Sequence, residues 1–151
     1  MNYISAFNAS LLCDMIFIYF TLYVPFLNSK YLVEWYNRYK LQAVIADVLI
    51  ITIGIIIAEK IYQKYIKKPK KGKYIVYFIL ITLGVQIIHD ILFYLAFKNI
   101  PNHSMFRLFQ NYANEIGYLA ILGDSAMIVL ACLFYILFSE KLTFNNNIEI
   151  S

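Results

Sequence analysis

The sequence predicts an all-α membrane protein, a bundle of four transmembrane helices built from two tandem two-helix repeats. The first observation is compositional: 62% of the 151 residues are hydrophobic and 15% are charged, against about 25% charged in an average soluble domain. A soluble domain of this size has too much surface for its volume to bury so much apolar area. We therefore expect the excess to face lipid.

The second observation is that the apolar residues gather into four stretches. They predict spans at 7–27, 41–58, 74–97 and 116–138. Each is near the length of about 20 residues that a helix rising 1.5 Å per residue needs to cross a hydrocarbon core of about 30 Å. None alternates as the strands of a membrane barrel do. The first lacks a basic region and a small-residue cleavage site, so we expect a retained span and not a signal peptide.

The loop between the second and third spans, 59–73, is the strongest charge feature. It holds seven lysines and, beyond Glu59, no acidic residue. The positive-inside rule makes this loop cytoplasmic, and with it both termini. Lysines beside two spans would also attract anionic lipid head groups: Lys64, Lys67, Lys68, Lys70, Lys71 and Lys73. No residue pattern in the loop is typical of base recognition, so we expect no nucleic acid partner.

The two halves of the chain resemble each other when shifted. A shift of 76 residues places Asp14 on Asp90, and a shift of 77 places Asp47 on Asp124. Because each unit has two spans, both would insert in the same orientation, with a pseudo-twofold axis along the membrane normal. The chain is then one membrane domain, 1–151, comprising repeat one (7–58), the lysine-rich loop (59–73), repeat two (74–138) and a polar C-terminal tail (139–151).

Each predicted span carries one aspartate, and no lysine or arginine lies in a span to pair with it. Placing a carboxylate at the centre of the bilayer costs a few kcal/mol of free energy (roughly 3 on insertion scales). Small residues share the stripe of the aspartate in the second span and in the fourth, where Gly117 is one of them. Such stripes let helices pack closely, so we expect the aspartates to point into the bundle. Their depth is expected to be in the outer half of the membrane or near its middle.

Carboxylates gathered in a dry site must be protonated or must share a cation. The candidate ligands for a cation or proton are Asp14, Asp47, Asp90, Asp124 and His89. Gln86 and Ser10 lie one turn before an aspartate and form a second tier. His89 is the nearest candidate partner for the aspartates; neighbours on a helix do not face each other, but His89 could still reach an aspartate on another helix.

The two outer loops contain aromatic segments, Tyr31–Tyr36 and Met105–Phe109. Such segments tend to lie in the membrane interface, so we expect Trp35 at head-group level. Cys13 and Cys132 lie inside predicted spans and form no C-x-x-C pair, which argues against thiol redox chemistry. We interpret them as small apolar helix residues.

Several segments resemble a known family: Gln86–Tyr94, Asn111–Gly117, Gly123–Met127 and Ala46–Ala58. This is a family of small four-span membrane proteins encoded by large double-stranded DNA viruses of protists and algae. The resemblance covers about residues 40–138. The family has no established activity, so the resemblance implies a setting, the internal membrane of a virion or a host membrane, and no mechanism.

Three functions stay open on the sequence alone. The leading hypothesis is an acidic core that binds or passes a cation or a proton. The second is a membrane scaffold whose lysine-rich loop contacts anionic lipid, capsid or another partner, with a homo-oligomer as one form. The third is an enzyme acting on lipid, for which the sequence offers His89 as the one histidine in a span and no catalytic residue. Beyond a bound cation, no cofactor is predicted.

Overall fold

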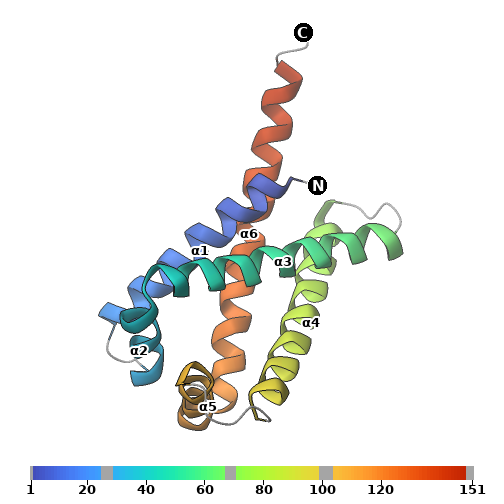
Figure 1. Ribbon diagram of the computed structural model, residues 1–151. Helices are drawn as coiled ribbons and strands as arrows, with labels where there is room; N and C mark the ends of the chain where they lie inside the picture. Colours follow the sequence, from blue (N-terminus) through green and yellow to red (C-terminus); the bar gives the residue numbers. More distant parts are fainter. Residues whose placement is uncertain (1, 25–28, 67–70, 99–103, 149–151) are drawn as a thin grey trace.

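The structure is a computed structural model that describes residues 2–24, 29–66, 71–98 and 104–148 (Figure 1). Every regular element in these ranges is a helix, which confirms the predicted all-α class. The helices are α1 (Tyr3–Tyr23), α2 (Lys30–Tyr39), α3 (Leu41–Tyr65), α4 (Lys71–Lys98), α5 (Ser104–Ile116) and α6 (Tyr118–Ile148).

Four of these helices are long and apolar enough to cross a membrane, as predicted. Their apolar stretches are Tyr3–Tyr23, Leu41–Tyr65, Lys73–Ala96 and Leu119–Ser139. The first begins before the predicted start at residue 7 because Asn2 caps the helix. The Asn2 side chain accepts a hydrogen bond from the backbone N–H of Ser5 at 3.1 Å, which satisfies one of the free donors at a helix start.

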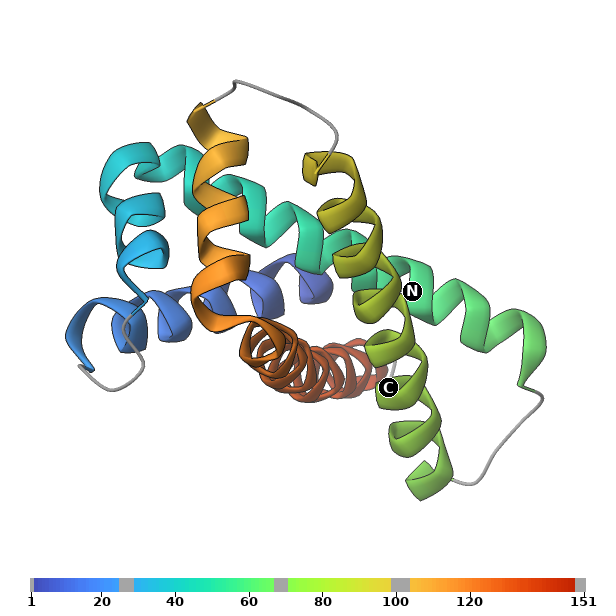
Figure 2. The ribbon, with the colours of Figure 1, turned by 90° about the horizontal axis from the view of Figure 1, so that it is seen from below.

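The four long helices form a closed ring in which α1 and α4 occupy opposite corners. In the described ranges α1 packs against α3 and α6, and α4 also packs against α3 and α6, whereas α1 and α4 do not touch. The bundle is crossed, because α1 and α3 run together across the molecule in Figure 2, where α6 is seen nearly end-on.

The interior of the ring is apolar and closely packed. Ile51 and Ile55 of α3 meet Phe78 of α4 and Ile128 of α6, each at most 2% exposed. Buried alanines on α1, α3 and α6 bring the helix backbones close, as in other membrane bundles. Both cysteines lie in this interior as free thiols. Large apolar side chains on the outer faces are exposed, as expected of faces that lipid covers.

The predicted lysine-rich loop is largely helical. Helix α3 continues past Ala58 to Tyr65, and α4 already begins at Lys71. Tyr62 accounts for part of this, because it is buried and its ring meets the ring of Tyr74 edge-on at 4.9 Å, which joins the two helix ends. Most of the predicted polar tail is helical, since α6 runs to residue 148.

The predicted lipid-binding lysines are only partly described. The side chains of Lys64 and Lys73 are exposed. Lys67, Lys68 and Lys70 lie outside the described residues, as does the side chain of Lys71.

The two predicted outer loops contain amphipathic helices, α2 and α5. They pack against each other, with the rings of Trp35 and Phe109 4.8 Å apart. Both lie at the end of the molecule opposite the N-terminal end of α1 and the C-terminal end of α6 (Figure 1). We call this end the cap side.

A single residue with positive φ joins each amphipathic helix to the long helix that follows. These residues are Lys40 (φ 46°) and Gly117 (φ 52°), which are 77 positions apart. Gly117 is therefore a turn residue, and its predicted place in the packing stripe of the fourth span is wrong. Glycine suits the turn because it lacks a Cβ. Both halves thus share one element order, which supports the predicted duplication; the duplication itself stays a prediction.

Candidate functional site

The four aspartates lie at similar distances from the cap side. Asp14 lies nine residues before the end of α1, and Asp90 lies eight before the end of α4. Asp47 and Asp124 lie six residues after the starts of α3 and α6. At 1.5 Å per residue, all four are about 9–14 Å inside their helices. The helices α2 and α5 lie directly beyond those helix ends, so they are placed to cover the aspartates.

Helix α2 delivers two donors to the first pair of aspartates. The indole Nε1 of Trp35 donates to Oδ2 of Asp47 at 3.2 Å, and the hydroxyl of Tyr36 donates to the same oxygen at 3.0 Å. The Tyr36 hydroxyl also lies 3.5 Å from Oδ1 of Asp14. Asp14 is 0% exposed, and its Oδ2 has no hydrogen-bond partner among the described residues. One phenol therefore lies between two buried carboxylates.

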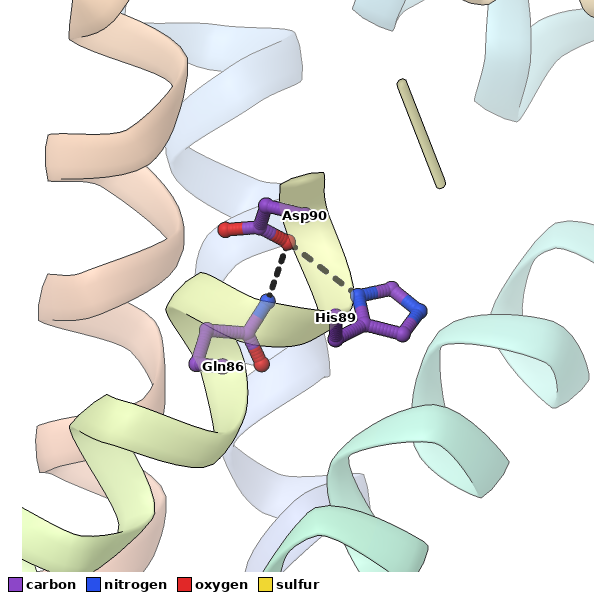
Figure 3. A network of polar contacts seen from close by, with 3 residues as sticks. All are labelled: Gln86, His89 and Asp90. Carbon is purple, nitrogen blue, oxygen red and sulfur yellow. Dashed lines mark hydrogen bonds and ion pairs between the residues drawn. The ribbon is translucent and has the colours of Figure 1, made fainter. Parts of the chain in front are cut away.

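Asp90 is held from within its own helix. The Gln86 amide donates to Oδ1 of Asp90 at 2.7 Å, and Nδ1 of His89 lies 3.1 Å from the same oxygen. Figure 3 shows both nitrogens converging on one oxygen, while the other points away from them. That second oxygen is buried and without a partner in the described ranges.

His89 contacts the neighbouring Asp90, and it also interacts electrostatically with Asp124 of α6, so the predicted reach to another helix is not contradicted. Its ring turns back along α4 to Asp90 and lies against Phe93, with ring centroids 5.5 Å apart. The imidazole Nδ1 lies near the backbone and the aspartate side chain is short, so the two neighbours meet at the edge of the helix although they do not share a face.

Asp124 and Tyr112 join the two halves of the site. Asp124 interacts electrostatically with Asp90, Asp47 and His89. Tyr112, on α5, interacts with Asp124, Asp90 and Asp47. We call the four aspartates with Trp35, Tyr36 and Tyr112 the capped acidic cluster.

The two capping phenols stay protonated. Burial raises the pKa of Tyr36, and the carboxylates of Asp47 and Asp14 raise it further. Burial likewise raises the pKa of Tyr112, with Asp124 adding the largest contribution among its charged neighbours. Both effects disfavour the phenolate, so each tyrosine keeps a hydrogen to donate to the carboxylates beneath it.

The cap helices are also tied to each other. Ser29, which precedes α2, donates through its hydroxyl to the carboxylate of Glu115 near the end of α5. The same Ser29 oxygen lies 3.5 Å from the backbone N–H of Leu32, as the N-cap of α2. These contacts and the ring pair of Trp35 and Phe109 fix α2 and α5 over the aspartates.

One predicted second-tier residue does not contact an aspartate. Ser10 is fully buried, but its hydroxyl donates to the backbone carbonyl of Ala6 at 2.9 Å. Serine commonly bonds back to the preceding helical turn in this way. In the ranges that the structure describes, no group of three or more His, Cys, Asp or Glu side chains is placed to hold a metal ion.

Sequence reasoning missed the capping residues. Trp35 is 4% exposed and packs between the rings of Tyr39 and Phe109, while its depth at head-group level stays a prediction. The signal was present in the spacing of Leu32, Trp35, Tyr36 and Tyr39, because apolar residues three and four apart mark one face of an amphipathic helix.

A second polar contact lies at the opposite end of the bundle. Glu59 of α3 is 8% exposed, accepts a hydrogen bond from the hydroxyl of Tyr135 on α6, and accepts another from the Gln63 amide at 3.0 Å. Between this contact and the capped acidic cluster lies the apolar interior around Ile51 and Ile55. The two polar sites are therefore separated by a largely apolar layer.

The fold and the span lengths together define the class of protein: the chain is compatible with a multi-pass integral membrane protein. No protein-family model, characterised protein or solved structure matches it.

Proposed function

We propose that the chain is an integral membrane protein whose capped acidic cluster binds and exchanges protons. The observation that carries this proposal is the Tyr36 hydroxyl between two carboxylates. A hydroxyl has one hydrogen to donate and lone pairs with which to accept. Its hydrogen goes to Asp47 at 3.0 Å, so toward Asp14 at 3.5 Å it can only accept.

We therefore place a proton on Asp14, which donates toward Tyr36, whereas Asp47 accepts from both Trp35 and Tyr36 and is the carboxylate to which a proton can pass. The resulting chain runs from Asp14 through Tyr36 to Asp47. Moving each hydrogen one step along it transfers a proton from Asp14 to Asp47 without breaking the cluster apart.

Electrostatic repulsion supports a site that holds protons. Two unit charges 4 Å apart repel by about 4 kcal/mol even at an effective dielectric of 20. Asp124 interacts with both Asp90 and Asp47, and the partly exposed His89 lies beside Asp90. Proton uptake removes this repulsion.

Infrared spectroscopy of the protein in nanodiscs tests the proposal. We expect a carboxylic acid C=O band at neutral pH that loses a component in Asp14→Asn and shifts in frequency in Tyr36→Phe. Glu34→Gln is the matched control, because Glu34 is exposed on α2 and pairs with Arg38 at 3.3 Å; it should leave the band unchanged. A wild-type protein without this band, or a band unaffected by Asp14→Asn, would refute the proposal.

A structural scaffold is the second candidate, and a specific observation favours it. The contacts of Trp35 with Asp47 and of Tyr135 with Glu59 each join different helices, as interhelical pins do. In this alternative the exposed lysines on the inner side bind anionic lipid or capsid, in the viral or host membrane that the family resemblance implies. In the scaffold the aspartates are protonated only to hydrogen-bond the helices together, so Asp14→Asn lowers stability and the wild-type carboxylic acid band does not titrate with pH.

A further inference from the structure

The lipid-facing side of α1 carries one amide. The side chain of Asn8 is exposed, and no described residue hydrogen-bonds to it. Leu11, Leu12 and Met15 follow on the same face at spacings of three, four and seven residues. Together with Phe138 of α6 they line an open groove of about 290 Å³. The groove is apolar except for the amide at one end.

The depth of Asn8 makes an unpaired amide costly. It lies five residues after the start of α1, about 7.5 Å along the helix. The 21 residues of α1 extend about 31 Å, about the thickness of a hydrocarbon core, so where α1 crosses the core from end to end, its sixth residue, Asn8, lies inside the core boundary. Its side chain has one methylene and cannot reach the interface as lysine does. A polar group left unsatisfied in hydrocarbon is strongly disfavoured.

We propose that a second copy of this chain covers this face, α1 against α1, with the two Asn8 amides hydrogen-bonded to each other. An amide is self-complementary, because it has both a carbonyl acceptor and N–H donors. Copies inserted in the same orientation place equivalent residues opposite each other about a twofold axis along the membrane normal. The spacing of Asn8, Leu12 and Met15 is that of a helix-pairing seam. Lipid tails could fill the groove but could not satisfy the amide.

Disulfide cross-linking in liposomes tests the interface. In a background with Cys13→Ala and Cys132→Ala, we expect Leu12→Cys to form a cross-linked dimer on mild oxidation. The matched control is Ile87→Cys on α4, because Ile87 is 41% exposed and Leu12 is 39% exposed, and α4 lies across the ring from α1. Ile87→Cys should stay monomeric. Equal cross-linking at both positions, or none at Leu12→Cys, overturns the proposal.

The role of the amide is tested in the same background. Adding Asn8→Leu should weaken dimerisation about tenfold, from the loss of interhelical amide bonds, whereas Asn8→Gln should preserve it. Circular dichroism should stay unchanged, since the side chain of Asn8 is exposed and contributes no packing to the fold. Dimerisation that is indifferent to Asn8→Leu would exclude the paired amides.

Discussion

Replacing Tyr36 with phenylalanine removes one hydroxyl and leaves the aromatic ring in place. The hydroxyl donates to Asp47 at 3.0 Å and lies 3.5 Å from Asp14. The first is a full hydrogen bond and the second is a weak one. Leaving a buried acceptor without its donor costs about 1–3 kcal/mol, and hydrogen bonds between membrane helices contribute about 0.6–2 kcal/mol. Asp47 keeps the Trp35 donor, so we expect a loss of about 1–2 kcal/mol in the free energy of unfolding.

Reversible unfolding in mixed micelles, followed by circular dichroism, measures this loss. Tyr23→Phe is the control, because Tyr23 is 70% exposed at the end of α1; it should change the unfolding free energy by less than about 0.5 kcal/mol. A double-mutant cycle with Asp47→Asn then isolates the contact, with a coupling energy of about 1 kcal/mol expected. Equal losses for the two tyrosines, or additive effects of Tyr36→Phe and Asp47→Asn, would show that the hydroxyl does not hold the cluster.

Three further predictions concern the turns, the pH dependence and the topology. Gly117→Ala should destabilise the protein by about 1–2 kcal/mol, because a side chain is strained at positive φ. Gly84→Ala is the control and should cause no loss, since nothing lies within 4 Å of the added Cβ and the helical φ is ordinary. Chemical unfolding of both variants measures the difference. Burial raises the pKa of Tyr112, so above pH of about 10 the unfolded chain binds fewer protons than the folded one and stability falls, by up to about 1.4 kcal/mol per pH unit for this group. Tyr112→Phe should flatten that fall in unfolding measured across alkaline pH, and an unchanged slope would contradict the assignment. The positive charge of the lysine-rich loop predicts that a thiol reagent labels Lys73→Cys only from the cytoplasmic side and Asn37→Cys only from outside. The opposite labelling pattern in intact cells would show that the predicted topology is wrong.

The sequence by itself determined the class of the molecule. Lipid requires every span to be a long apolar helix with its backbone bonds satisfied internally, and this requirement is local. The four helices, and the position of one aspartate in each, could therefore be predicted from composition and length. Their similar depth followed from counting residues to the helix ends.

The tertiary structure decided what meets the aspartates. The outer segments are short, and nothing in their local sequence distinguishes a helix that lies in the interface from one that folds over the bundle. The position of α2 over the bundle depends on Trp35, which packs between rings from two helices and donates to Asp47. The placement of Tyr36 between Asp14 and Asp47 likewise depends on how α1, α2 and α3 cross. Periodicity gives the face of a helix, but rotation and crossing angle between helices are set by the packing of side chains distant in sequence.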